Sequence, residues 1–216
     1  MIIEGTYEKY KAFLKQLKKE YCFSDEILYG MCEKEPKHED EDIITGKICL
    51  IGRTYAAAIE RRKKSDDYQG DDFYKDKVGP EMMKVGKELD NLLDKLRKSK
   101  GLISDNINEI LDTHSFLMKV FKKITHMEKR SLASKYLHFH CREKFFIYDS
   151  RACSAIRKVV RKPYNEPRID GFDPPYVDFV CKMLELQKYL LKKGCSLKET
   201  TPRKLDRFLL ESVTNN

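Results

Sequence analysis

The chain lacks several features that would assign it to a class of protein at once. No run in its 216 residues reaches the roughly eighteen apolar residues that a membrane span needs. The N-terminus has charges every few residues and no apolar stretch before a cleavage site, so we expect no signal peptide. None of the seven cysteines forms a CxxC pair, and their odd number disfavours a disulfide framework. We therefore expect a protein of the reducing cytoplasm without membrane contact.

Apolar residues at helical spacing are what the sequence has in quantity. Hydrophobic residues make up 41% of the chain, which is enough for a core. Apolar side chains recur every three or four residues in several segments, and prolines stand at the first turns of three of them. The sequence predicts an all-α fold, either one domain over residues 1–216 or two lobes with a boundary near the polar loop at 65–77. Helices are expected at 6–21, 80–98, 104–111, 116–124, 151–162 and from Pro174 and Pro202 onward.

Two neighbouring segments are less clear. The run IITGKICLIG, residues 43–52, fits a strand or a helix. The next segment, GRTYAAAIERRKK, is predicted to be helical because alanine is a strong helix former. Its Arg53 and Arg61 are weighed as phosphate contacts, and the favoured interpretation is a packing helix with charge pairs.

Positive charge is concentrated in one part of the chain. Residues 119–168 contain fourteen Lys and Arg but only four Asp and Glu, a net charge of +10. The rest of the chain carries −2, within a total of +8. A local basic surface favours a polyanionic partner, most often a nucleic acid, and the alternative is a surface that only keeps the protein soluble.

The stretch SLASKYLHFHCREKFFIYDSRAC, residues 131–153, raises the question of an active site. Asp149 stands before a helix that it can cap, and the plain interpretation makes Lys135 a surface lysine. A lysine amine is a nucleophile only when burial or nearby cations lower its pKa. Lys129 and Arg130 supply such cations, and apolar neighbours surround Lys135 along its helix. Catalysis is therefore the second interpretation.

This stretch resembles the core segment of the helix-hairpin-helix DNA glycosylase superfamily, in the branch of the oxidised-guanine glycosylases. The resemblance rests on "SLASKYLHFH…FFIYDSRA", about 25 residues. It implies a two-lobed glycosylase-like fold in which Lys135 is the nucleophile and Schiff-base lysine. Asp149 would stabilise the positive charge on the sugar, and residues 146–148 would lead to it. Arg151 matches a phosphate contact.

The resemblance further implies how DNA is held. The hairpin segment HMEKRSLASK contains no glycine, so Lys129 and Arg130 are expected to hold the phosphate by charge in place of backbone amides. A flipped nucleotide would enter the cleft between the lobes. Candidates for contact with the base are Tyr164, Phe172 and Tyr176. The remaining candidate nucleic-acid contacts are Arg157, Lys158, Arg161 and Lys162.

A zinc site is considered and not favoured. His138, His140, Cys141 and Cys153 are ligand types, but structural zinc usually uses two closely spaced ligand pairs. His138 and His140 are two positions apart, so on a helix they point in different directions. We expect no metal and no cofactor.

The expected function is that of a DNA-binding protein resembling a base-excision glycosylase and abasic-site lyase, with Lys135 and Asp149 as its catalytic residues. Whether the chain is an enzyme stays open. The first alternative is a non-catalytic nucleic-acid-binding protein of the same fold. The second is a protein-interaction or defence-system component whose basic face meets an acidic protein.

Overall fold

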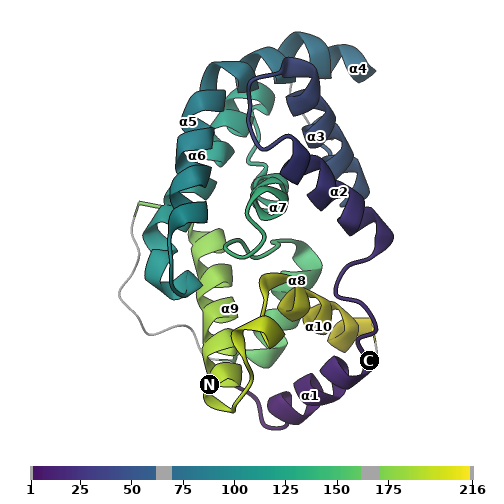
Figure 1. Ribbon diagram of the computed structural model, residues 1–216, viewed down its shortest axis with the longest axis vertical. Coiled ribbons are helices and arrows are strands. Elements are labelled where there is room, and N and C mark those ends of the chain that lie inside the picture. Colours follow the sequence, from purple (N-terminus) through teal and green to yellow (C-terminus); the bar gives the residue numbers. More distant parts are fainter. Residues whose placement is uncertain (1, 62–69, 162–170, 215–216) are drawn as a thin grey trace. The chain divides into compact units, whose positions relative to one another are not determined.

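A computed structural model of the protein describes residues 2–61, 70–161 and 171–214. Within these ranges the chain is helical, and its only extended pairing is an isolated bridge between Ile2 and Val160. The all-α prediction is thus confirmed (Figure 1). None of the described helices combines the length and the apolar composition that crossing a membrane requires.

The chain forms two compact units. Unit 2 is the continuous stretch Phe23–Phe145, and unit 1 combines Met1–Cys22 with Phe146–Asn216. Residues 65–77, where the sequence suggests a boundary between lobes, fall within the range of unit 2, and residues 65–69 lie outside the described part of the chain. The crossing points between the units instead follow Cys22 and Phe145.

Unit 2 is built around helix α7. This helix packs against α2, α3 and α6, and every residue from Leu132 to His140 is buried. Figure 1 shows α7 between these helices, and α5 runs beside α6. The elements of unit 2 are α2 (Phe23–Lys34), α3 (Glu41–Thr54), α4 (Gly70–Phe73), the π-helical turn η1 (Tyr74–Val78), α5 (Gly79–Lys98), the 3₁₀ turn η2 (Ile103–Asn106), α6 (Ile107–Thr125) and α7 (Arg130–His140).

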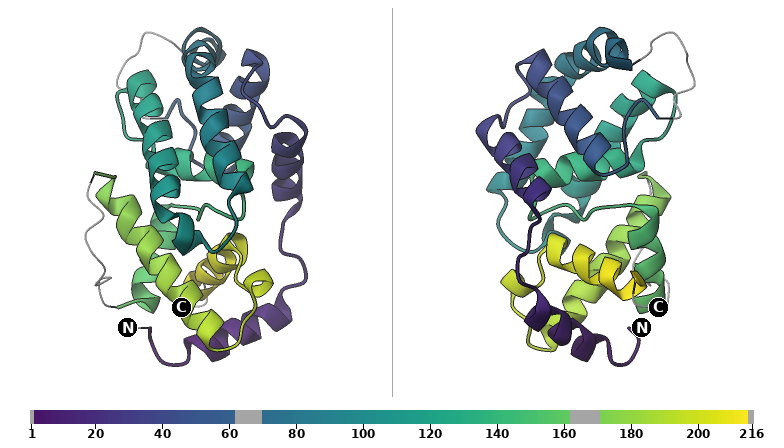
Figure 2. Two further views of the ribbon diagram at one scale, coloured as in Figure 1. Left: turned by 60° about the vertical axis from the view of Figure 1, so that its left-hand side comes forward. Right: turned by 90° about the vertical axis from the view of Figure 1, so that its right-hand side faces the viewer.

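Unit 1 packs its helices around α8. One face of α8 is buried and apolar, and the helix contacts both α9 and α10 (Figure 2). An aromatic pair of Tyr10 and Phe208, with ring centroids 4.9 Å apart, joins α1 to α10. The elements of unit 1 are α1 (Thr6–Gln16), α8 (Ser150–Val159), α9 (Pro174–Lys192), the 3₁₀ turn η3 (Leu197–Glu199) and α10 (Pro202–Thr214).

The prediction of a helix over GRTYAAAIERRKK is wrong, because the helix of this region lies earlier in the chain. The ambiguous run before it forms α3, whose start is fixed because the Asp40 side chain accepts a hydrogen bond from the Ile43 amide at 3.0 Å. The helix ends at Thr54, and Ala56 has a left-handed φ of 52°. The chain turns there and runs back so closely that a Cβ on Gly52 would lie 3.0 Å from the Ala58 Cα. Tertiary packing thus outweighs the helix propensity of three alanines.

Two further helix boundaries differ from the prediction. The helix expected at 6–21 ends at Gln16. The two helices expected at 104–111 and 116–124 are one helix, α6, which begins at Ile107 after a 3₁₀ turn. Residues 112–115 contain no proline or glycine, so nothing in them interrupts the helix. The expected starts at Pro174 and Pro202 are confirmed.

Candidate functional site

Lys135 is a buried residue in the second turn of α7. Only 2% of it is exposed, so the interpretation as a surface lysine is wrong. Its Nζ donates hydrogen bonds to the Ser131 Oγ at 2.9 Å and to the Tyr55 carbonyl oxygen at 3.1 Å. The ammonium also lies 5.7 Å from the centroid of the Tyr55 ring. The lysine therefore connects the central helix of unit 2 to the turn that follows α3.

Asp149 caps helix α8, as the sequence predicts. Its Oδ1 accepts a hydrogen bond from the Ala152 amide at 2.8 Å, and its carbonyl oxygen accepts one from the Cys153 amide at 2.9 Å. The carboxylate is at the first turn, where it also faces the positive end of the helix dipole. Asp149 belongs to unit 1 and Lys135 to unit 2.

The exposed face of α8 carries basic side chains and no acidic ones. Arg151, Arg157 and Lys158 are exposed, and Arg161 follows just after the helix. No Asp or Glu occurs from residue 150 to residue 161. Among the described residues, no ion pair or hydrogen bond engages these four side chains. Lys162, the remaining predicted contact of this segment, lies outside the described residues.

This face exists because small and apolar residues occupy the other side of the helix. The side chains buried against α9 and α10 recur at helical spacing. With that side in the core, Arg151 and Lys158, which are seven positions apart, share the outer side of the helix. The buried residues are Ala152, Ala155, Ile156 and Val159.

Within the described ranges, the cations around the turn between α6 and α7, unlike those of α8, form ion pairs or hydrogen bonds. Arg130 and Lys122 form ion pairs with Glu128 at 3.2 and 3.3 Å. Lys129 donates a hydrogen bond to the Arg61 carbonyl oxygen. These positive charges are thus already engaged within unit 2, in contrast to those of α8.

A carboxylate also compensates Lys123 of α6. Glu81 pairs with Lys123 at 2.8 Å and with Lys84 at 2.6 Å. These hydrogen bonds lower the pKa of Glu81 to about 2, the contact with Lys123 having the larger effect. The carboxylate is therefore ionised at neutral pH.

The residues considered for zinc do not come together as a metal site. His138 is buried, its Nδ1–H donating to the Phe145 carbonyl oxygen at 2.7 Å and its Nε2 accepting from the Tyr29 hydroxyl at 2.5 Å. Cys153 belongs to unit 1 and the other three residues to unit 2. In the described part of the chain, no three His, Cys, Asp or Glu side chains are grouped closely enough to hold a metal ion.

The other sequence candidates have structural partners or lie elsewhere. Arg53 pairs with Glu60 at 3.2 Å and lies 5.4 Å from the centroid of the Tyr74 ring. Tyr176 is buried on α9, and its ring is 6.1 Å from that of Tyr148. Phe172 is half-buried in the turn before α9. Tyr164 lies outside the described residues.

Sequence patterns did not indicate a buried polar cluster in unit 2. His38 forms hydrogen bonds through Nδ1 to the Asp90 Oδ1 at 2.6 Å and through Nε2 to the Tyr136 hydroxyl at 2.8 Å. His140 packs beside it, 4.6 Å from the Tyr136 ring and 4.9 Å from the His38 ring. Burial lowers the pKa of His38 despite its bond to Asp90. No local motif links residues so far apart in sequence.

Comparison of the chain with models of protein families, with curated proteins and with solved structures finds no match. Function is therefore inferred from the chain's own residues and their geometry.

Proposed function

We propose that the protein binds DNA through the basic face of α8, which consists of Arg151, Arg157, Lys158 and Arg161. The observation that carries this proposal is the set of four exposed cations that no acidic side chain engages among the described residues. Paired cations must give up a partner before they bind a phosphate, whereas these four bind at no such cost. Arginine also suits phosphate because its guanidinium donates two hydrogen bonds in one plane.

The rigidity of the helix supports the same proposal. α8 is fixed at its start by the Asp149 cap and along its length by contacts with α9 and α10. Arg151, Arg157 and Lys158 are therefore held on a packed helix instead of a free loop, which reduces the entropy lost on binding. Arg161 lies two residues beyond the end of this helix. Contacts of this kind hold the backbone and do not read the sequence, so we expect little sequence preference.

The dependence of affinity on salt tests this proposal. We expect the logarithm of the association constant for a duplex to fall linearly with the logarithm of the salt concentration. The slope should be about −3 to −4, because each neutralised phosphate releases about 0.9 counterion. Fluorescence anisotropy of a labelled duplex measures it. An affinity that does not change with salt, or binding only to an acidic protein, would contradict the proposal.

A second candidate function is that of a glycosylase or abasic-site lyase using Lys135 and Asp149. The specific observation in its favour is that Lys135 lies on the second of two helices joined by a short turn, α6 and α7, and Asp149 opens a later helix. Both features agree with the resemblance of residues 131–153. In this function Lys135 would displace the base from the sugar, and Asp149 would stabilise the cationic sugar.

Borohydride trapping on duplexes with an abasic site or an oxidised guanine distinguishes the two candidates. The lyase would give a covalent adduct with the wild type that is lost in Lys135→Gln and reduced in Asp149→Asn. Asparagine caps helices about as well as aspartate, so Asp149→Asn removes the charge and keeps α8. A DNA-binding protein without lyase activity would give no adduct and unchanged affinity in both variants.

A further inference from the structure

The buried polar cluster of unit 2 lies where the segment between α2 and α3 meets other helices. This segment, residues 35–40, is called the α2–α3 segment below. His38 of the segment forms hydrogen bonds with Asp90 of α5 and with Tyr136 of α7. The buried Lys47 of α3 donates hydrogen bonds to two carbonyl oxygens of the segment. Buried polar contacts therefore hold the segment against three helices.

The hydrogen bonds of His38 suit its neutral form. Nδ1 faces the Asp90 carboxylate at 2.6 Å and donates to it, so Nε2 of the neutral ring accepts from the Tyr136 hydroxyl at 2.8 Å. A second proton would be on Nε2, and the hydroxyl would then have to accept instead of donate. Among the described residues, no other group accepts the hydrogen of this hydroxyl. Protonation would thus leave a buried donor unpaired, which costs free energy.

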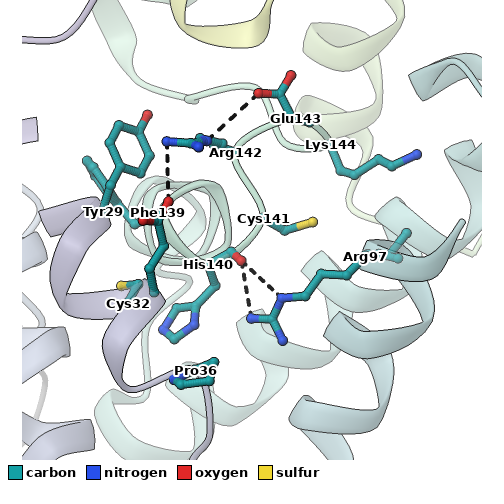
Figure 3. A pocket seen from close by; sticks show the side chains of 12 residues that line it. Tyr29, Cys32, Pro36, Arg97, Phe139, His140, Cys141, Arg142, Glu143 and Lys144 are labelled. Carbon is teal, nitrogen blue, oxygen red and sulfur yellow. Dashed lines mark hydrogen bonds and ion pairs between the residues drawn. The ribbon is translucent and has the colours of Figure 1, made fainter. Parts of the chain in front are cut away.

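His140, at the end of α7, is still less suited to a second proton. Its side chain is buried, and neither ring nitrogen has a hydrogen-bond partner in the described structure. The ring lies 4.9 Å from the His38 ring and 4.6 Å from the Tyr136 ring. Figure 3 shows it pointing toward Pro36 of the α2–α3 segment. A protonated His140 would have two buried N–H donors without an acceptor, beside a second histidine.

The fixed charges around the two rings also oppose protonation. Lys47 and Arg97 are cations that act on both imidazoles. The Arg97 guanidinium is held there because it donates a hydrogen bond to the His140 carbonyl oxygen at 3.2 Å. Asp90 is the opposing charge, and it contacts His38. Protonation of both rings would place four positive charges around this carboxylate.

The remaining titratable groups of the cluster supply little negative charge. Asp94 of α5 already pairs with Lys37 at 2.6 Å and with Arg97 at 2.9 Å. Burial raises the pKa of the Cys32 thiol to about 12 and that of Tyr136 well above its usual value, so both stay neutral. The other carboxylates of the α2–α3 segment are exposed and screened by water, namely Glu35, Glu39 and Asp40.

These surroundings make the stability of unit 2 depend on pH. Burial lowers the pKa of His140 well below its usual value, with smaller effects from His38, Lys47 and Arg97. Burial also lowers the pKa of His38, against the opposing effect of Asp90. In the unfolded chain histidines take up protons at about pH 6.5. The folded state therefore loses stability as the pH falls below this value, down to the lower pKa values of the folded state.

We propose that this cluster is an acid-sensitive switch, in which proton uptake by His38 and His140 below about pH 6 releases the α2–α3 segment from α5 and α7. At neutral pH both rings are uncharged and the segment stays bound. In acid the released rings reach water, which solvates their charge. The switch lies in unit 2 and uses no residue of α8, so it is independent of the proposed DNA binding.

Hydrogen exchange of the full chain at about pH 7.5 and about pH 5.5 tests the switch. Comparing each exchange rate with that of the unfolded chain at the same pH gives a protection factor free of the direct effect of pH. We expect protection of the α2–α3 segment to fall by about tenfold through His140, and by a smaller factor through His38. All five histidines belong to unit 2, so α9 of unit 1 should keep its protection.

Substitutions of histidine assign the effect to the cluster. His140→Phe keeps a ring beside Tyr136 and removes both nitrogens, so the fall in protection should be about tenfold smaller than in the wild type. His140→Leu makes the same comparison with another side chain if phenylalanine prevents folding. The control His126→Asn removes an exposed histidine with a left-handed φ of 56°, which asparagine tolerates. It should show the same fall as the wild type.

Two results would overturn the proposal. One is equal protection of the α2–α3 segment at the two pH values in the wild type, or a fall of the same size in the folded His140 variants. The other is an equal fall in α9, because acid would then loosen the whole chain and not this cluster.

Discussion

Replacing all four cations of the α8 face by glutamine is expected to reduce duplex affinity by about 10²- to 10³-fold at 0.1 M salt. Each lost phosphate contact should also make the salt slope shallower by about 1, so the slope of this variant should approach zero. Glutamine keeps the helix propensity of the positions, which are exposed, so the fold should be unaffected. Anisotropy titrations at several salt concentrations measure both quantities.

The matched control removes the same charge from another part of unit 1. Lys188, Lys192, Lys193 and Lys198 are exposed, and among the described residues none of them forms an ion pair. Their replacement by glutamine lowers the net charge by the same four units. If the basic face of α8 is the binding surface, this control keeps most of the affinity. Equal losses in both variants would mean that the total charge matters and α8 does not.

Gly86→Ala is expected to destabilise unit 2 by about 2 kcal/mol or more, as overpacking against backbone does. A Cβ at this position of α5 would lie 2.9 Å from the His38 Cβ and would also overlap the His38 carbonyl oxygen. Because backbone cannot move aside as a side chain can, the contact between α5 and the segment at His38 must open. That segment carries the hydrogen bonds from His38 to Asp90 and Tyr136.

Gly30→Ala on α2 is the control for this effect and should have the opposite sign. Gly30 is in the middle of a helix, and a Cβ there would meet nothing within 4 Å. Alanine should therefore stabilise the protein by about 0.5 to 1 kcal/mol through its higher helix propensity. Urea unfolding followed by circular dichroism measures both variants. Similar effects from the two substitutions would contradict the packing described around His38.

Local patterns in the sequence predicted the features that depend on local interactions. The cap at Asp149, the helix start at Pro174 and the basic outer face of α8 follow from residues within two turns of one another. The burial of Lys135 could not be predicted in this way. It depends on α7 being surrounded by other helices and on a bond to the carbonyl oxygen of Tyr55, eighty positions away.

The same limit explains what the sequence missed. The bond between His38 and Asp90 joins residues 52 positions apart, and the bond between His38 and Tyr136 joins residues 98 positions apart. The three alanines at 56–58 show the converse case, in which a strong local preference loses to packing against Gly52. Positions where distant segments meet are thus the ones that single-sequence patterns describe least well.

Hydrogen exchange with and without a DNA duplex tests the central claim most directly, because it locates the binding surface without any substitution. The account predicts that DNA slows exchange in α8, where the amides of Ser150–Val159 belong to the helix that carries the basic face. Peptides from α9, over Pro174–Lys192, should change little. Protection confined to other helices, with α8 unchanged, would contradict the claim that this face binds DNA.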